Sequence, residues 1–513
     1  MKGDFRLKLI LYSLFIIGIS KTSGQDSVPK LIMTFDQALE IAKQNSHIIK
    51  QTQYLQEEKI QLSKASKGLY LPKIGITASY MMLSDDLTLD LTPVRDAITP
   101  LYSALGNYGV FSGVPNPDPA TNQQMPVLPD NLSTQVVRNN LQQGLATIQS
   151  SEWDRMIQKK QFGTVAATML WPLYTGGKIQ AANRAAHIEQ QEAGEVMKQK
   201  EGELLTELVE RYFGLSLARQ AVLVRSDVLT GMQHHLSDAE KMQHNGLIAN
   251  AEVLQAKLYH SQADRELKKA YRNVSVLNDA LINTLALDDT IIQPATLLFY
   301  LDSIEPVEYF IGLGSAKNPM LLQVESKKQL AGINKRVQQS DYFPVIAVQG
   351  MYNIAEKDLS PYTPDWMAGV GLKWTFFDGA SRYRKVKAAN AKADQVGEIQ
   401  QKAQTDVSTM INKLYQELNM YQEQLIALET SGTFAEEYLR VREKGFREEM
   451  SNATEVVDAR MALAQVSIER LQAMYGYDVT LARLLQYAGI PEEFMNYKTR
   501  KEARTESYQP MNN

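Results

Sequence analysis

The chain has 513 residues, of which 44% are hydrophobic and 22% charged, and its formal net charge is −4. This length supplies a large core, and the near-neutral charge gives no support for nucleic-acid binding, which usually shows a basic excess. The absence of cysteine excludes disulfides, thiolate metal sites and cysteine nucleophiles.

The first residues follow the order of a secretory signal. Basic residues precede an apolar run from Leu9 to Ile19, and small residues follow it. The run is shorter than a comfortable membrane span of about 20 residues, so an N-terminal anchor helix is the less favoured alternative. We therefore expect residues 1–24 to be a signal peptide. An exported chain without long apolar helices can still enter a membrane as a β-barrel.

The first repeat, residues 25–287, begins with a predicted helix and strand. Apolar periodicity after the capping residue Thr34 indicates a helix to about Lys67. Alternation from Ile74 to Met82 indicates a strand with one apolar face. Residues 84–160 are rich in proline and polar side chains, and we expect a long irregular loop there. Short helices are expected inside it around 95–108 and 131–158.

A second strand and a long helical hairpin complete this repeat. Alternation from Phe162 to Trp171 predicts the strand. From Lys178 to His244 apolar residues recur every three or four positions, which predicts a helix of roughly 100 Å at 1.5 Å per residue. Such a rod needs neighbouring rods to bury its apolar stripe. It stops at Gly246, and a returning helix is expected from Asn250 to about Leu287.

The remaining chain repeats this order. A connector, 288–305, is expected to be irregular, and the second repeat covers residues 306–490. Its expected elements are helices at 307–340, 380–447 and 451–486 and strands at 345–352 and 366–374. Residues 491–513 form a polar C-terminal tail, which we expect to be disordered from Asn496.

One offset relates the two repeats. The segments that run from Trp171 to Gly176 and from Trp374 to Gly379 lie 203 positions apart, and the same offset relates Ala256 to Ala459. A constant offset without gaps indicates an internal duplication.

Each repeat thus supplies two strands, and four strands cannot close a barrel, for which about eight is the practical minimum. Open strand edges are not tolerated in lipid, so we expect the chain to pool its strands with copies of itself. Three copies would give twelve strands and a pore. The predicted fold class is an internally duplicated α+β membrane protein. Its long α-helical hairpins form an α-barrel, and four β-strands per chain contribute to a trimeric 12-stranded β-barrel.

These features resemble the TolC-like outer-membrane efflux family of Gram-negative bacteria, over the mature chain to about residue 490. The resemblance rests on the two strand-to-helix junctions, on the Leu-Pro and Phe-Pro strand starts, and on the hairpin tips. The tip segment of the family has a glycine and, ten positions later, an alanine, here Gly246 and Ala256. The second copy has Glu449 in place of the glycine.

The resemblance implies a homotrimeric channel in the outer membrane, with a helical tunnel in the periplasm, that does no chemistry itself. The implied partners are further copies of the chain, a periplasmic membrane-fusion adaptor, an inner-membrane pump of the RND or ABC type, and outer-membrane lipid. Cofactors, metals and nucleic acid are not expected. The implied task is tripartite efflux or type I secretion, with the cargo chosen mostly by the pump.

The family also implies a periplasmic gate with acidic residues six and nine positions after the tip glycine. These positions hold Glu252 and Gln255 in the first copy and Glu455 and Asp458 in the second. Three-fold symmetry would arrange them as rings of carboxylates, which favour cations. The alternative is that they are solvated residues at helix N-termini, where the helix dipole stabilises acids.

The tips themselves are the predicted docking site for the adaptor. Apolar residues on such a turn, where polar residues are expected, suggest a contact surface. The alternative is a hydrophobic staple that packs back on the hairpin. The predicted docking residues are Gly246, Leu247, Ile248, Glu449, Met450 and Ser451.

The strand-helix junctions Trp171, Gly176, Trp374 and Gly379 complete the candidate residues. Aromatic residues at strand ends are typical of membrane interfaces, but the two tryptophans precede the turn into the helix, which favours packing there. Histidines at 234 and 235 diverge on a helix, so a solvated surface is the favoured interpretation.

Two other classes of function compete with a channel. A periplasmic coiled-coil adaptor or structural scaffold without a membrane barrel explains the long helices but not the four strands with apolar faces. An exported enzyme has no motif in its support, and no catalytic residues are predicted.

Overall fold

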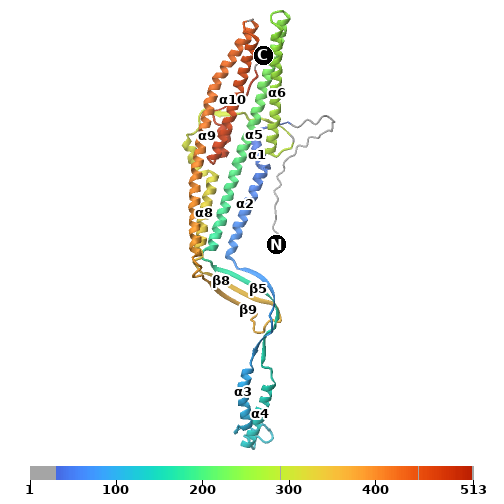
Figure 1. Ribbon diagram of the computed structural model, residues 1–513, viewed down its shortest axis with the longest axis vertical. Helices are drawn as coiled ribbons and strands as arrows, with labels where there is room; N and C mark the ends of the chain where they lie inside the picture. Colours follow the sequence, from blue (N-terminus) through green and yellow to red (C-terminus); the bar gives the residue numbers. More distant parts are fainter. Residues whose placement is uncertain (1–29, 289, 449, 511–513) are drawn as a thin grey trace, which may run out of the picture. The chain divides into compact units, whose positions relative to one another are not determined.

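The computed structural model describes residues 30–288, 290–448 and 450–510, so the predicted signal peptide lies outside the described residues. The chain forms two compact units (Figure 1). The helical unit comprises Met1–Ile60, Ile188–Gln329 and Asp394–Asn513, and the sheet unit comprises Gln61–His187 and Leu330–Ala393. Each unit draws on both predicted repeats, whose boundaries remain predictions.

Two long hairpins supply most of the helical unit. The first is α5 (Lys178–His244) with α6 (Asn250–Leu285), and the second is α9 (Ser381–Arg447) with α10 (Ala453–Tyr487). These bounds agree with the predicted helices because the 3.6-residue periodicity runs unbroken through each rod. At the centre of the core, the ring of Phe35 lies 5.5 Å from that of Tyr212.

The first predicted helix is in fact two helices. Thr34 caps α1 (Phe35–Asn45) in a capping box with Gln37, and α2 (His47–Ser66) follows after Ser46. The prediction of one helix from Thr34 to Lys67 was wrong at this break. A 3-10 turn, η1 (Lys67–Tyr70), ends the segment.

The break has an equivalent in the second repeat, between α7 (Val307–Lys317) and α8 (Pro319–Ser340). The amide of Asn45 donates to the carbonyl of Leu285 at 3.1 Å, and that of Asn318 donates to the carbonyl of Tyr487 at 2.8 Å. Each asparagine thus satisfies a carbonyl at the end of its own returning helix. The duplication is therefore visible in tertiary hydrogen bonds as well as in the sequence.

The connector between the repeats was expected to be irregular, but its described residues include two short strands. It contains β6 (Ile291–Pro294), which pairs in parallel with β1 (Lys30–Met33), and the fully buried β7 (Phe299–Leu301). Runs of three or four residues are too short for periodicity to reveal, and their partners are distant in the sequence.

The polar C-terminal tail also packs, so the expectation of disorder from Asn496 was wrong. After η2 (Pro491–Glu493), the short helix α11 (Phe494–Lys498) buries Phe494 and Tyr497, and β10 (Ala503–Thr505) pairs antiparallel with β7. Two aromatic residues three positions apart suffice to anchor an otherwise polar segment.

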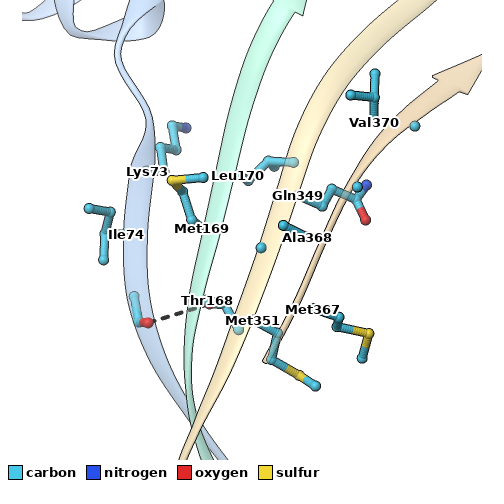
Figure 2. A pocket seen from close by; sticks show the side chains of 14 residues that line it. Lys73, Ile74, Thr168, Met169, Leu170, Gln349, Met351, Met367, Ala368 and Val370 are labelled. Atoms are coloured by element: carbon cyan, nitrogen blue, oxygen red, sulfur yellow. Dashed lines mark hydrogen bonds between the residues drawn. The ribbon is translucent and has the colours of Figure 1, made fainter. Parts of the chain in front are cut away.

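The sheet unit is built on one open antiparallel sheet in the order β2-β5-β8-β9. Its strands are β2 (Lys73–Met82), β5 (Gln161–Tyr174), β8 (Val345–Lys357) and β9 (Trp366–Lys373). Strands from the two repeats pair at β5 and β8. Residues of these four strands line a hollow of about 860 Å³, and Figure 2 shows their side chains.

The register places apolar residues of all four strands on one face. One aligned row is Ile74, Met169, Gly350 and Ala368, and the next is Ile76, Ala167, Tyr352 and Trp366. Successive side chains of a strand alternate, so the intervening residues lie on the other face, which is mixed: it carries the small or polar Gly75, Thr168 and Gln349 and also Leu170, Met351 and Met367.

The segment 84–160, expected to be an irregular loop, is largely regular. It contains β3 (Leu87–Asp90), α3 (Thr92–Tyr108), α4 (Asp130–Ser150) and β4 (Asp154–Gln158), with β3 paired to β4. The predicted second helix was too long at its C-terminal end, where β4 takes its place. Five prolines of the segment lie between α3 and α4, the last of them, Pro129, directly before α4, whereas Pro100 lies inside α3.

None of the helices in the described part of the chain combines the length and the apolar character needed to cross a membrane. Within the same residues, no group of three or more His, Asp or Glu side chains is arranged to hold a metal ion.

Candidate functional site

The first hairpin turn is closed by a glycine in the left-handed region. Gly246 has φ +73°, its N–H donates to the carbonyl of Gln243, and the N–H of Leu247 donates to the carbonyl of Met242, both at 2.9 Å. This pair of bonds is the Schellman ending of a helix, for which glycine is the preferred residue.

The second turn keeps the closing bond although the glycine is missing. The N–H of Met450 donates to the carbonyl of Gly445 at 2.8 Å, 203 positions after the equivalent pair in the first turn. Glu449, which replaces the glycine, lies outside the described residues. Asn452 then caps α10 by accepting from the N–H of Glu455 at 2.9 Å. The two turns therefore share one architecture.

Apolar residues at the tips divide into packed and exposed ones. Ile248 packs against Val253 and Ala256, as the staple alternative expected. Leu247 and Met450 are 55% and 73% exposed, and they are the apolar tip residues available to a partner. The half-buried Ser451 packs close to Gly445.

The four predicted gate residues lie near the N-termini of α6 and α10, with Glu252 and Glu455 in the first turn and Gln255 and Asp458 in the second. Gln255 donates to the hydroxyl of Thr454 at 3.1 Å, so the two hairpins meet at this level. Glu252 is half-buried. Asp458 is exposed and lines a cavity of about 510 Å³, which Arg225 and Arg265 also line.

Glu455 differs from the other gate residues because it has a cationic partner. Its carboxylate lies 2.9 Å from the guanidinium of Arg442 on α9, which stacks at 5.2 Å from the ring centre of Tyr438. The pair ties α9 to α10. Sequence periodicity gives no signal for this pair, since the two residues face each other across the turn rather than along one helix.

A second polar cluster, also missed, lies between the hairpins near their ends. Arg460 of α10 is buried, forms an ion pair with Glu443 of α9, and packs so closely on Gly231 of α5 that any Cβ there would overlap its guanidinium. His235, expected to be solvated, is only 7% exposed and lies 5.0 Å from the ring of Phe446. The expectation was wrong because tertiary packing of α9 covers this face of α5.

Burial lowers the pKa of the His235 imidazole, and Arg460 acts in the same direction, whereas Asp238 and Glu443 oppose them. A folded-state pKa below the usual value of about 6.5 means that the unfolded chain binds a proton the folded chain does not, so stability falls as the pH drops below that value.

We expect His235→Gln to reduce the loss of thermal stability between about pH 7 and pH 5, measured on the detergent-solubilised protein. His234→Gln is the matched control, because His234 is exposed on the same helix turn. An unchanged acid sensitivity in the His235 variant would assign that sensitivity to other groups.

The two strand-helix junctions contain the same tryptophan hydrogen bond and the same glycine conformation. The indole N–H of Trp171 donates to the carbonyl of Tyr70 at 2.9 Å, and that of Trp374 donates to the carbonyl of Tyr342 at 3.1 Å. Gly176 and Gly379 follow with φ of +64° and +67°, which only glycine adopts easily. Both tryptophans thus hold the chain that enters the sheet, as the packing interpretation expected.

Solved structures that share this fold include an outer-membrane protein and two outer-membrane channels. VceC of Vibrio cholerae is 14% identical, with 89% of this chain and 96% of that chain covered, and has a TM-score of 0.64. The CmeC channel of Campylobacter jejuni is 12% identical, with 89% and 86% covered and a TM-score of 0.64. The open state of MtrE from Neisseria gonorrhoeae is also 12% identical, with 89% and 88% covered and a TM-score of 0.64.

Residues 312–490 match the family described as "Outer membrane efflux protein". A search of curated proteins gives no match to the sequence. The similarity to these solved structures therefore shows the fold of the chain. The chain thus shares its fold with solved outer-membrane proteins, and its C-terminal part, residues 312–490, is similar to the outer membrane efflux protein family.

Proposed function

We propose that three copies of this chain form an outer-membrane duct that conducts substrates from a periplasmic adaptor and an inner-membrane pump to the exterior. The observation that carries the proposal is the exposed apolar face of the four-stranded sheet. Ile74, Ile76 and Val370 on that face are 76%, 73% and 68% exposed in the single chain. An apolar surface of this extent requires lipid or a partner to cover it.

The two outer strands of the sheet are available to pair with further copies of the chain. β2 and β9 are the outer strands, and within the described chain neither has a partner on its outer side. In an antiparallel sheet of four strands, β9 of one copy runs antiparallel to β2 of the next. Further copies can therefore extend the sheet and keep its antiparallel order. Three copies then close a twelve-stranded β-barrel whose apolar face is turned to lipid.

The helical unit supplies the periplasmic end of the duct. Rings of Glu252, Glu455 and Asp458 would form the gate, with Gln255 as a neutral position between the hairpins. The exposed Leu247 and Met450 would be the docking contacts of the membrane-fusion adaptor, in the tip segments that contain Gly246, Ile248, Glu449 and Ser451. The pump, of the RND or ABC type, would select the cargo and supply the energy, and the channel would do no chemistry.

A test follows from two neighbouring residues of β8. The register places Val348 on the apolar face and Gln349, which is labelled in Figure 2, on the opposite face. Arginine on a lipid-exposed position costs about 2–4 kcal/mol at the bilayer midplane. We therefore expect Val348→Arg to abolish most of the outer-membrane trimer, whereas Gln349→Arg retains it.

The measurement is membrane fractionation followed by gel electrophoresis of unheated samples. Equal tolerance of both arginines would remove the sheet from the lipid. A monomer soluble without detergent would favour the alternative, a periplasmic scaffold without a membrane barrel.

A further inference from the structure

The helix α3 carries an exposed apolar stripe with seven-residue spacing. Val94, Leu101 and Tyr108 are 50%, 57% and 82% exposed and follow one another at intervals of seven. Ala97 and Ala104 lie between them, three positions after the first two, and are also exposed. Apolar residues at the first and fourth positions of a heptad are the pattern of helices that pack along a seam with other helices.

The partner within the chain, α4, does not cover this stripe. A different face of α3 packs on α4, where a Cβ at Gly144 would lie 3.3 Å from the ring of Tyr102 and a Cβ at Gly106 would lie 3.6 Å from Leu141. At the far end of the hairpin, Arg138 donates to the carbonyl of Gly109 at 2.8 Å. The two helices thus pack as one hairpin (Figure 1). The residues of the heptad stripe remain exposed.

The hairpin is also nearly without charge. α3 and α4 contain only Arg95, Asp96, Asp130 and Arg138 as charged residues, and Arg95 lies 2.9 Å from Asp96. A solvated helix face usually carries charges, whereas the buried centres of subunit interfaces are depleted of them. The composition therefore favours a protein partner on the stripe.

The base of the hairpin is held to the sheet by several bonds. The pair β3 and β4 continues from β2 and β5, Lys159 lies 2.6 Å from Asp358, and the side chain of Gln158 donates to the carbonyl of Asp358 at 2.8 Å. The position of α3 relative to the sheet is therefore set by the protein itself. Copies that share a barrel would present their α3 helices in the same orientation and at the same level.

We propose that the stripe is a subunit contact, in which the α3 helices of three copies pack in parallel through Val94, Leu101 and Tyr108. This inference rests on the proposed trimer. In parallel helices of identical sequence, the apolar residues of the heptad lie at the same level along the axis. Each one can therefore pack against its equivalent in the neighbouring copy. The alanines Ala97 and Ala104 allow the helices to approach closely at the intervening layers.

The absence of cysteine in the chain makes the test direct. Leu101→Cys is introduced alone and the assembled protein is treated in its membrane with a short bismaleimide. Gln143→Cys, at an exposed position of α4, is the matched control. We expect Leu101→Cys to give predominantly cross-linked dimers on a denaturing gel and Gln143→Cys to stay monomeric.

Unheated samples of both variants report trimer assembly separately. A contrary outcome would be Leu101→Cys trimers that do not cross-link and whose thiol reacts with a bulky polyethylene glycol maleimide. That result would overturn the α3 contact and leave the proposed channel intact. Loss of trimers in the parent protein would overturn both.

Discussion

A chain truncated after Ile490 is expected to lose assembly in the outer membrane. The removed segment is polar in sequence, yet it contributes Phe494 and Tyr497 to the core of the helical unit. The ring of Phe494 lies 5.6 Å from those of Phe35 and Phe299. Removal of one such aromatic residue costs about 3–5 kcal/mol, a large part of a typical folding free energy of about 5–15 kcal/mol.

Polar contacts add to the loss. The hydroxyl of Tyr497 donates to Glu305 at 2.7 Å, and Arg500 lies 2.8 Å from the same carboxylate. Truncation leaves Glu305 without both partners, and the pairing of β10 with β7 is lost as well. Unpaired polar groups left in a partly buried site add a desolvation cost.

The measurement is the amount of trimer in isolated membranes, together with the thermal midpoint of Phe494→Ala in detergent. A chain that ends at Gln509 is the control, because it retains the contacts of α11 and β10. We expect the control to assemble normally. Normal assembly of the chain that ends at Ile490 would show that the tail contributes little to the core.

Replacement of all three acidic gate residues by their amides, Glu252→Gln, Glu455→Gln and Asp458→Asn, is expected to lower the cation preference of the open channel several-fold. Each substitution removes three charges from a three-fold ring, and carboxylate rings concentrate cations. The measurement is the reversal potential in a salt gradient across a planar bilayer. An unchanged reversal potential would place these residues outside the conduction path.

The structure predicts an order among the single variants. Arg442 already neutralises much of the field of Glu455 at 2.9 Å, whereas Asp458 is exposed. We therefore expect Asp458→Asn to change selectivity more than Glu455→Gln does. Arg442→Gln should act in the opposite direction and raise the cation preference, which makes it an internal control for the sign. A larger effect of Glu455→Gln would mean that the ion pair opens in the conducting state.

The duplication and the long hairpins could be predicted from the sequence alone. The apolar period continues over 67 residues in α5 and again in α9. Each turn of the helix repeats the same signal, so the pattern defines a helix and excludes a strand. The strands were predictable for a similar reason, because alternation over eight or more residues defines both the strand and its apolar face. The junction tryptophans and glycines were identifiable because they recur at one offset, whereas the tip glycine occurs in the first copy only.

Only the tertiary structure decided which residues meet across that framework. The burial of His235 beside Phe446, the Arg442–Glu455 pair, and the anchoring of the tail by Phe494 each join segments that lie on different helices or far apart in the chain. Local patterns report the period of an element and the face it buries. They do not report what covers that face, because the covering residues are set by packing between elements.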